Sequence, residues 1–438
     1  MSDAVIFAFI YLGALVLLGG TGFPVAVVIF VITLTSVLWF FGPAMIGPIA
    51  DLAWSSMNNY ILIAMPLFIL MGELMLRSGV TEKMYTTLSM WMTRLPGRLL
   101  HTNIVACALF AASTGSSVAT AATIGTVSMP ALSSRGYDKK LAFGSIAAGG
   151  TLGILIPPSL NLIIYGVMTD TSIGKLFIAG VVPGLLLAGL FMAIITVHAL
   201  LRPHVAPFNA DDVLPIRRRI SALPATIPPL IVIFGVIGSI YAGFATPTEA
   251  AAVGVLVALA LAAGYRRLSV PMLNDTFRST IRTTGMVMLI IVAAFLMNFV
   301  VALLGIPQTI AEWVRSLDVT PTGVLFILLL IYMLLGCFLE GLSMMITTVP
   351  IVAPLVISLG VDPVWFGIFI VLVTELALIT PPVGINLYVV QGIRTDGGSI
   401  SDVIVGTIPF AFTVLLFTVL MIYLPQIALW LPEQMMGQ

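Results

Sequence analysis

Residues 153–159 read Gly-Ile-Leu-Ile-Pro-Pro-Ser, and residues 378–384 read Leu-Ile-Thr-Pro-Pro-Val-Gly. In each stretch a pair of prolines interrupts a long apolar run. Proline lacks a backbone N–H and clashes with the preceding helical turn, so a helix must unwind at such a pair. Unwound backbone at membrane depth is tolerated only where it is buried in protein or lines a cavity. A simple kink would explain one isolated pair, whereas two comparable pairs indicate functional breaks in two membrane helices.

The composition of the chain places both breaks in a membrane protein. Of 438 residues, 60% are hydrophobic and 8% are charged, against about 25% charged in soluble domains. The net charge of zero argues against a nucleic-acid partner. Cys107 and Cys337 lie in apolar runs and the histidines are scattered, so the sequence predicts no disulfide framework and no metal cluster. We therefore expect a chain embedded in a lipid bilayer.

The apolar runs predict an all-α integral membrane protein with about ten spanning helices, since about 20 apolar residues cross the hydrocarbon. The expected spans lie near 4–20, 24–41, 56–76, 140–168, 175–200, 222–243, 247–264, 283–303, 364–390 and 403–431. No basic segment precedes the first run, so we expect a mature helix rather than a signal peptide. The runs 101–133 and 321–359 are interrupted by small polar residues and are expected to form two re-entrant hairpins. The amphipathic segments 80–94 and 305–318 are expected to lie along the membrane surface as arms.

The positions of the basic residues test this layout. With both hairpins entering and leaving on one side, every Lys and Arg except Lys175 and Arg315 falls on one face of the membrane. Short cytoplasmic loops concentrate basic residues, so that face is predicted to be cytoplasmic. The segment 201–221 would be a cytoplasmic linker, and 266–282 would also be cytoplasmic, while 42–55 and the C-terminal tail would lie on the opposite side.

The two halves of the chain also resemble each other. Pro130, Gly136 and Asp138 recur 224 residues later as Pro354, Gly360 and Asp362, and Pro157-Pro158 recurs as Pro381-Pro382. The first repeat would span 1–200 and the second 222–438, each with one hairpin and one broken helix. Five spans per repeat make the second copy inverted. Inverted repeats with broken helices are typical of secondary transporters.

The hairpin tips carry the polar groups nearest the breaks, at Ser113–Ser117 and Glu340–Ser343. Hydroxyls at the first tip can bind sodium or an oxyanion, although small residues also serve helix packing. Glu340 at mid-membrane depth needs a cation or a proton. Glu375 lies near the second break and is a candidate to support an ion site there.

Two further acids have simpler explanations. Glu73 is four residues before Arg77, which favours an intrahelical ion pair. Glu249 follows Thr246-Pro247 at a helix start, where it serves as a cap or tie as readily as in transport.

These features together favour ion-coupled uptake of a small organic acid. The carbonyls freed at the breaks are hard-oxygen ligands for a cation, and the helix N-termini after the prolines favour an anion. No Lys or Arg lies mid-span to pair with an acidic substrate, so Ser117, Ser159, Asn161 and Asn386 are the predicted anion-facing groups. The sequence shows no phosphate-binding loop and no nucleophile–base pair, so an enzyme is not expected. The hairpins and broken spans are expected to move as one domain against a fixed frame of the remaining helices and arms.

Several motifs resemble the large membrane subunit of tripartite ATP-independent periplasmic (TRAP) transporters. They are Thr-Ala-Ala-Thr-Ile-Gly at 120–125, Arg-Gly-Tyr-Asp at 135–138, the two proline stretches quoted above, and Thr-Pro-Thr-Glu-Ala at 246–250. The resemblance implies an elevator-type sodium symporter in the bacterial inner membrane, with Na⁺ as coupling ion and no other cofactor. It also implies a separate small four-helix membrane subunit and a periplasmic substrate-binding protein. A stand-alone dicarboxylate or anion:sodium symporter of the same design is the alternative.

The resemblance also implies two sodium sites. The first would use Thr114, Ser116, Gly153, Ile156 and Pro158. The second would use Glu340, Gly341 and Thr380. This chain departs from the family at Thr114, where serine is frequent, and at Glu340, where aspartate is common.

Overall fold

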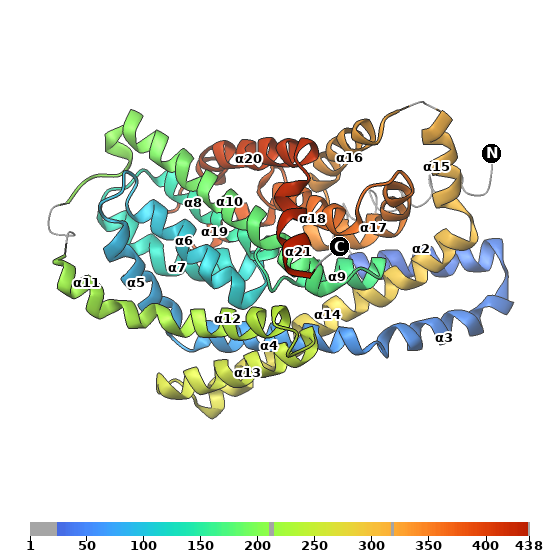
Figure 1. Cartoon of the computed structure of the whole chain (residues 1–438), viewed down its shortest axis with the longest axis horizontal. Coiled ribbons are helices and arrows are strands. Elements are labelled where there is room, and N and C mark those ends of the chain that lie inside the picture. Colours follow the sequence, from blue (N-terminus) through green and yellow to red (C-terminus); the bar gives the residue numbers. More distant parts are fainter. Residues whose placement is uncertain (1–23, 210–213, 317–318, 437–438) are drawn as a thin grey trace.

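The computed structural model describes residues 24–209, 214–316 and 319–436, and its regular structure there is helical. This confirms the predicted all-α membrane fold. Figure 1 shows long helices extended along one side of the molecule and a second body of helices packed against them. The expected first span, 4–20, lies outside the described residues.

The helices along the lower side of Figure 1 form what we call the frame. They are α2 (Val25–Phe40), α3 (Ile46–Met57), α4 (Ala64–Arg77), α12 (Ile227–Tyr241), α13 (Pro247–Gly264) and α14 (Val270–Leu303). Helix α4 packs against α13 and α14, and α14 packs against α2. Their outward surfaces expose large apolar side chains such as Phe30 and Phe234, as suits contact with lipid.

The second body contains both hairpins and both broken helices, and we call it the hairpin group. The hairpins are α6 (Leu99–Thr114) with α7 (Ser117–Ser134), and α16 (Pro321–Gly336) with α17 (Gly341–Ser358). The broken helices are α8 (Lys139–Leu155) with α9 (Leu160–Thr169), and α18 (Pro363–Ile379) with α19 (Ile385–Gly392). The first break contains Pro157-Pro158 and the second contains Pro381-Pro382, as the sequence predicted. Helices α10 (Ile173–Leu201) and α20 (Ile400–Tyr423) pack against α8 and α18. By packing they belong with this group, although the sequence analysis placed them in the expected frame.

Close packing inside the hairpin group depends on glycine. A Cβ on Gly144 of α8 would overlap the backbone of Gly406 on α20, and a Cβ on Gly406 would overlap the backbone of Lys140. Helix association in membranes depends on such small residues, because lipid tails are as apolar as the helices themselves. The glycines thus hold an element of the first half directly against one of the second.

The two amphipathic segments are helices that contact the hairpins. Helix α5 (Val80–Met92) packs against α6 and α7, and α15 (Ile306–Ser316) packs against α17. They lie at opposite ends of the molecule in Figure 1. The order of three frame helices, arm, hairpin, broken helix and long helix therefore occurs in both halves.

Several helix ends differ from the sequence prediction. Residues 46–57, expected in a loop, form α3. Helix α14 begins at Val270 and has 34 residues, more than the roughly 20 that cross a membrane. Most of the segment 266–282, expected as a loop, therefore forms the first turns of this helix. The expected linker contains the short helix α11 (Ile216–Ala222). The last span ends at Tyr423, and after Pro425 a separate helix α21 (Gln426–Met436) follows, because proline has no N–H to continue the ladder.

The number of membrane-crossing helices agrees with a multi-pass protein. Eight helical segments of the described chain are long and apolar enough to cross a bilayer. The shorter apolar helices found there are α2, α6, α16 and α18. The shorter ones are mainly the halves of hairpins and broken helices, which need not cross the membrane alone.

Candidate functional site between the hairpin tips

The first hairpin turns at Gly115, whose φ of +60° suits glycine because a side chain is strained there. Ser116 is the N-cap of α7, and its hydroxyl accepts a bond of 3.4 Å from the amide of Ala119. The Ser116 carbonyl also accepts from the Thr120 hydroxyl at 2.7 Å. These bonds fix the backbone of the tip at the place where polar groups were predicted to bind an ion.

The first break packs directly onto this tip. A Cβ on Gly153 would lie 2.7 Å from the Ser116 carbonyl oxygen, and a Cβ on Gly115 would lie 2.8 Å from that of Pro158. No backbone amide of the described chain donates to the carbonyl of Ile156 or Pro158. The structure therefore brings Ser116, Gly153 and Pro158 of the predicted first sodium site together at this tip.

Thr114 completes this group on the side of the frame. Its hydroxyl donates to the Phe110 carbonyl at 3.3 Å and lies 3.1 Å from the Thr120 hydroxyl. A Cβ on Gly72 of α4 would lie 3.0 Å from the Thr114 Cα. The tip thus touches the frame at the same residue that is predicted to bind sodium.

Glu340 occupies the equivalent place in the second hairpin, as N-cap of α17. One carboxylate oxygen, Oε2, accepts from the Ser343 amide at 3.0 Å and from its hydroxyl at 3.1 Å. A carboxylate is stabilised at a helix N-terminus by the unpaired amides there. This contact offsets part of the cost of holding a carboxylate away from bulk water. The neighbouring Gly341 lies against Thr374, since its Cβ would be 2.5 Å from the Thr374 methyl group.

Thr380 and Glu340 line different cavities. The Thr380 hydroxyl donates to the Leu376 carbonyl at 2.6 Å and faces a different cavity, lined by α16, α18 and α20. The second break is instead approached by the end of α16. A Cβ on Gly336 would lie 2.5 Å from that of Ala377, and the Cys337 sulfur lies 3.6 Å from the Pro381 carbonyl. Sequence reasoning missed Gly336 and Cys337, which the end of an apolar run at the hairpin tip could have indicated.

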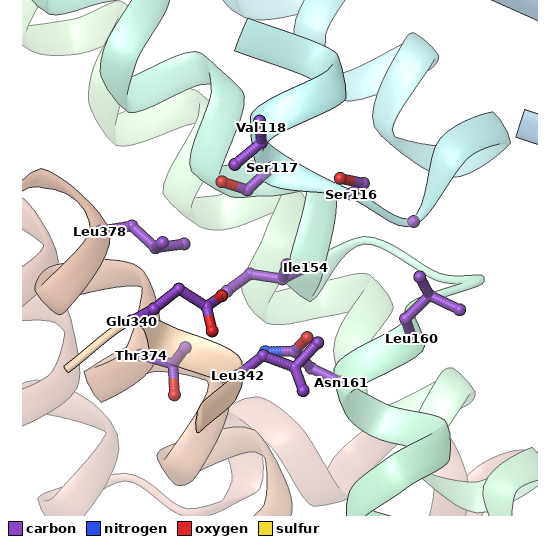
Figure 2. A pocket seen from close by; sticks show the side chains of 11 residues that line it. Ser116, Ser117, Val118, Ile154, Leu160, Asn161, Glu340, Leu342, Thr374 and Leu378 are labelled. Carbon is purple, nitrogen blue, oxygen red and sulfur yellow. The ribbon is translucent and has the colours of Figure 1, made fainter. Parts of the chain in front are cut away.

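Two cavities meet at the tips. A small one of about 70 Å³ lies between the hairpins and is lined by Ser116, Ser117, Asn161, Glu340 and Thr374 among others. Figure 2 shows the Glu340 carboxylate on one side of it and the Ser116–Ser117 segment on the other. A larger cavity of about 700 Å³ shares Ser116 and Glu340 with it and extends between the hairpin group and frame helices α4 and α14. No Lys or Arg is among the lining residues of either cavity in the described structure.

The four predicted anion-facing residues divide into two pairs. Ser117 and Asn161 line the small cavity. Ser159 and Asn386 are fully buried and engaged elsewhere. Ser159 is the N-cap of α9 and donates to the Ile154 carbonyl. Asn386 accepts from the Ser117 hydroxyl at 2.9 Å and donates to the Ala147 carbonyl at 3.1 Å. Asn386 thereby fixes the first tip to the second broken helix.

The remaining intramembrane acids have distinct surroundings. Glu73 pairs with Arg77 at 3.3 Å, as predicted, and accepts from the Ser279 hydroxyl of α14 at 2.6 Å. Glu249 forms a capping box with Thr246, which is the structural role considered for it. Glu375 is fully buried in α18 and lines neither of the two cavities at the tips.

Comparison with known proteins identifies the family. The family model described as "Tripartite ATP-independent periplasmic transporter, DctM component" matches residues 12–427. The chain belongs to this family. It is therefore a TRAP large permease and a multi-pass protein of the bacterial inner membrane.

Two relatives show the extent of the similarity. The C4-dicarboxylate TRAP transporter large permease protein of Rhodobacter capsulatus is 36% identical over 97% of this chain and 99% of its own length. The sialic acid TRAP transporter large permease protein of Vibrio cholerae is 32% identical over 87% of this chain and 88% of its own length.

A solved structure supports the fold of this TRAP permease. The YdaH transporter of Alcanivorax borkumensis superimposes with a TM-score of 0.62 at 14% identity, covering 99% of both chains. At that identity the similarity concerns the arrangement of helices alone.

Proposed function

We propose that this TRAP permease performs sodium-coupled secondary active uptake of a small organic acid by an elevator mechanism. The observation that carries the proposal is the convergence of both hairpin tips and the first helix break on the joined cavities at Ser116 and Glu340. A site between two bodies of helices can face either side of the membrane when one body moves against the other.

Sodium coupling is supported by the oxygen atoms around the first tip. The Ile156 and Pro158 carbonyls accept no backbone amide in the described chain. A Cβ on Gly115, between Thr114 and Ser116, would lie 2.8 Å from the Pro158 carbonyl oxygen, and a Cβ on Gly153 would lie 2.7 Å from that of Ser116. Sodium is a hard cation that prefers such oxygen ligands, and no cluster of His, Cys or acidic residues for a transition metal occurs among the described residues. The second proposed site keeps Glu340, Gly341 and Thr380, and Thr380 is the C-cap of α18 at the second break.

A carboxylate substrate is supported by the N-termini of α7 and α9. Both helices begin beside the small cavity, at Ser117 and Leu160, and present partial positive charge to an anion. The relatives named above are permeases for C4-dicarboxylates and sialic acid, both of which carry carboxylates. We extend that substrate class to this chain.

The working assembly would contain a separate small four-helix membrane subunit and a periplasmic substrate-binding protein. The moving body would be the hairpin group, including α10 and α20, and the frame would remain fixed. The contact between Gly72 and the Thr114 backbone lies at the boundary between the two. Such an elevator carries the whole site across, because both tips belong to the moving body.

The test is uptake into proteoliposomes that contain the permease, its small subunit and the binding protein. A labelled organic acid should accumulate under an inward sodium gradient, in the absence of ATP, and only with the binding protein present. Undiminished uptake without sodium at fixed pH would exclude sodium coupling. Full uptake without the binding protein would instead support a stand-alone symporter.

A further inference from the structure

Glu375 lies in the middle of α18, and its side chain is completely buried. Neither of its carboxyl oxygens has a hydrogen-bond partner anywhere in the described part of the chain. Every other residue of α18 from Val364 to Ile379 is buried as well. The carboxyl therefore sits in the interior of the hairpin group, out of contact with water.

No other acid of the described chain is in this position. Glu375 is the only carboxylic acid among its buried residues. Glu73 has Arg77 and Ser279, Glu249 has Thr246, and Glu340 has Ser343. Each of those carboxylates is satisfied where it stands, which makes the environment of Glu375 exceptional in this fold.

The elements around α18 supply no hydrogen-bond partner for Glu375 in the described chain. One helical turn away on α18 itself lie Val371, Leu372, Leu378 and Ile379, which are all apolar. Eight helices of the described chain pack on α18, and their titratable groups, with that of the α17 N-cap and that of the second tip, are the following: Lys139 and Lys140 (α8), Tyr165 (α9), Lys175 and His198 (α10), Tyr332 (α16), Glu340 (N-cap of α17), Cys337 (second tip), Tyr388 (α19), Asp402 and Tyr423 (α20) and Glu433 (α21). None of these groups bonds to Glu375: the Tyr165 hydroxyl donates to the Pro363 carbonyl at 2.7 Å, and the Tyr332 hydroxyl is bonded to Thr348.

An ionised carboxylate in such a place is strongly disfavoured. Moving an unpaired charge into an apolar interior costs several kcal/mol or more, and groups in this situation neutralise instead. From this geometry we propose that Glu375 is a proton-binding site, occupied by a proton when the hairpin group is packed as in this structure. The proton comes from water and forms an O–H bond on one carboxylate oxygen, and on release it returns to water.

The position of the carboxyl connects this proton to the transport cycle. Helix α18 ends at Ile379, four residues after Glu375 and directly before the second break. It packs against α8 of the first broken helix and against hairpin helices α16 and α17. Its neighbour Thr374 lines the cavity between the tips. Loss of the proton would place a charge between these elements and disfavour their packing. Uptake should therefore decline on the alkaline side as Glu375 ionises.

The direct test is infrared spectroscopy of the purified permease. The wild type at neutral pH should show the carbonyl stretch of a protonated carboxylic acid, and Glu375→Gln should remove that band. Glu340→Gln is the matched control, because it removes a carboxylate that is partly exposed and hydrogen-bonded, and it should leave the band in place. Absence of the band from the wild type, or its persistence in Glu375→Gln, would overturn the proposal.

Transport supplies the second readout. Glutamine reproduces the shape of the neutral acid, so Glu375→Gln should fold, keep its sodium-driven uptake within about two-fold and lose the alkaline decline. If Glu375→Gln does not fold, Glu375→Leu replaces it in the test. Leucine also cannot ionise, so this variant should lose the alkaline decline as well. A folded Glu375→Gln protein with no uptake at any pH, or with an unchanged pH profile, would contradict the proposal. The infrared result does not depend on uptake, so failure of the proposed sodium coupling would leave the proton assignment standing.

Discussion

At Gly153, helix α8 passes so close to the first hairpin tip that only a residue without a side chain fits. A Cβ there would meet both the carbonyl oxygen and the carbonyl carbon of Ser116, at 2.7 and 2.8 Å. Backbone atoms cannot move aside as the end of a flexible side chain can. The glycine therefore sets the distance between the break and the tip, and with it the positions of the carbonyls proposed to bind sodium.

We predict that Gly153→Ala displaces the tip from the break and lowers uptake at least ten-fold, with a higher sodium concentration needed for half-maximal rate. Gly189→Ala on α10 is the matched control, because nothing lies within 4 Å of its Cβ position. Both rates would be measured in proteoliposomes over a sodium titration. Equal sodium dependence of the two variants would contradict the proposed role of Gly153.

Ser116→Ala and Glu340→Ala test the polar groups themselves. Each removes an oxygen at the junction of the two cavities, and each should abolish sodium-dependent uptake while expression and docking of the binding protein persist. Glu73→Ala should have a smaller effect, since Glu73 is already paired with Arg77 and Ser279. Wild-type uptake and sodium dependence in both Ser116→Ala and Glu340→Ala would show that the ion sites are elsewhere.

At the scale of elements, an ionic cluster joins the start of α8 to the connection between α19 and α20. The Lys139 ammonium lies 2.6 Å from the Asp396 carboxylate, which also accepts from Arg394. Arg394 reaches Asp402 at 2.9 Å and stacks over the Phe143 ring at 4.7 Å. The cluster therefore holds one broken helix of the first half against the end of the second.

The Arg394 guanidinium holds the pKa of the Asp396 carboxyl well below its usual range, and the hydrogen bond from Lys139 lowers that pKa further. A depressed acid contributes stability above its ordinary pKa of about 3.9 and loses it as the pH falls toward the folded-state value. Because the cluster is partly exposed, we expect Asp396→Asn to cost about 1 kcal/mol or less.

Thermal unfolding in detergent would measure this loss. The difference from wild type should be constant from about pH 5 to 8 and should shrink on acidification below about pH 4. Asp275→Asn, at an exposed acid of α14 for which the described structure shows no ion pair, should have no such effect. A loss for Asp396→Asn that grows on acidification would refute the assignment.

At the scale of the molecule, the membrane orientation follows from the basic residues, and we predict that the loop between α10 and α12 is cytoplasmic. Cysteine at Ser221 should be labelled by an impermeant thiol reagent only in inverted vesicles, and cysteine at Gly47 only in intact cells with a permeable outer membrane. Both positions are exposed. Cys337 would be replaced first to remove background. Labelling of position 221 from outside would overturn the inverted-repeat arrangement.

Features that depend on a few neighbouring residues were predictable from the sequence. The proline pairs end α8 and α18 because they lack amide donors, and the hairpins turn at Gly115 and before Glu340, where small and polar residues interrupt the apolar runs. The Glu73–Arg77 pair follows from helical spacing alone. The extents of α3, α14 and α21 were not predictable from hydrophobicity, which marks apolar runs but not where a helix continues beyond the membrane.

The sequence by itself determined the class of the protein, the two breaks, the two hairpins and the residues of the first tip, because composition, proline and glycine act locally. Only the tertiary structure decided which of these residues meet. Ser117 bonds to Asn386, 269 residues away, Glu340 lies opposite Ser116 while Thr380 faces another cavity, and Glu375 is left without a partner. The physical reason is that the face each helix turns inward is fixed by packing against other helices, through contacts such as Gly144 with Gly406.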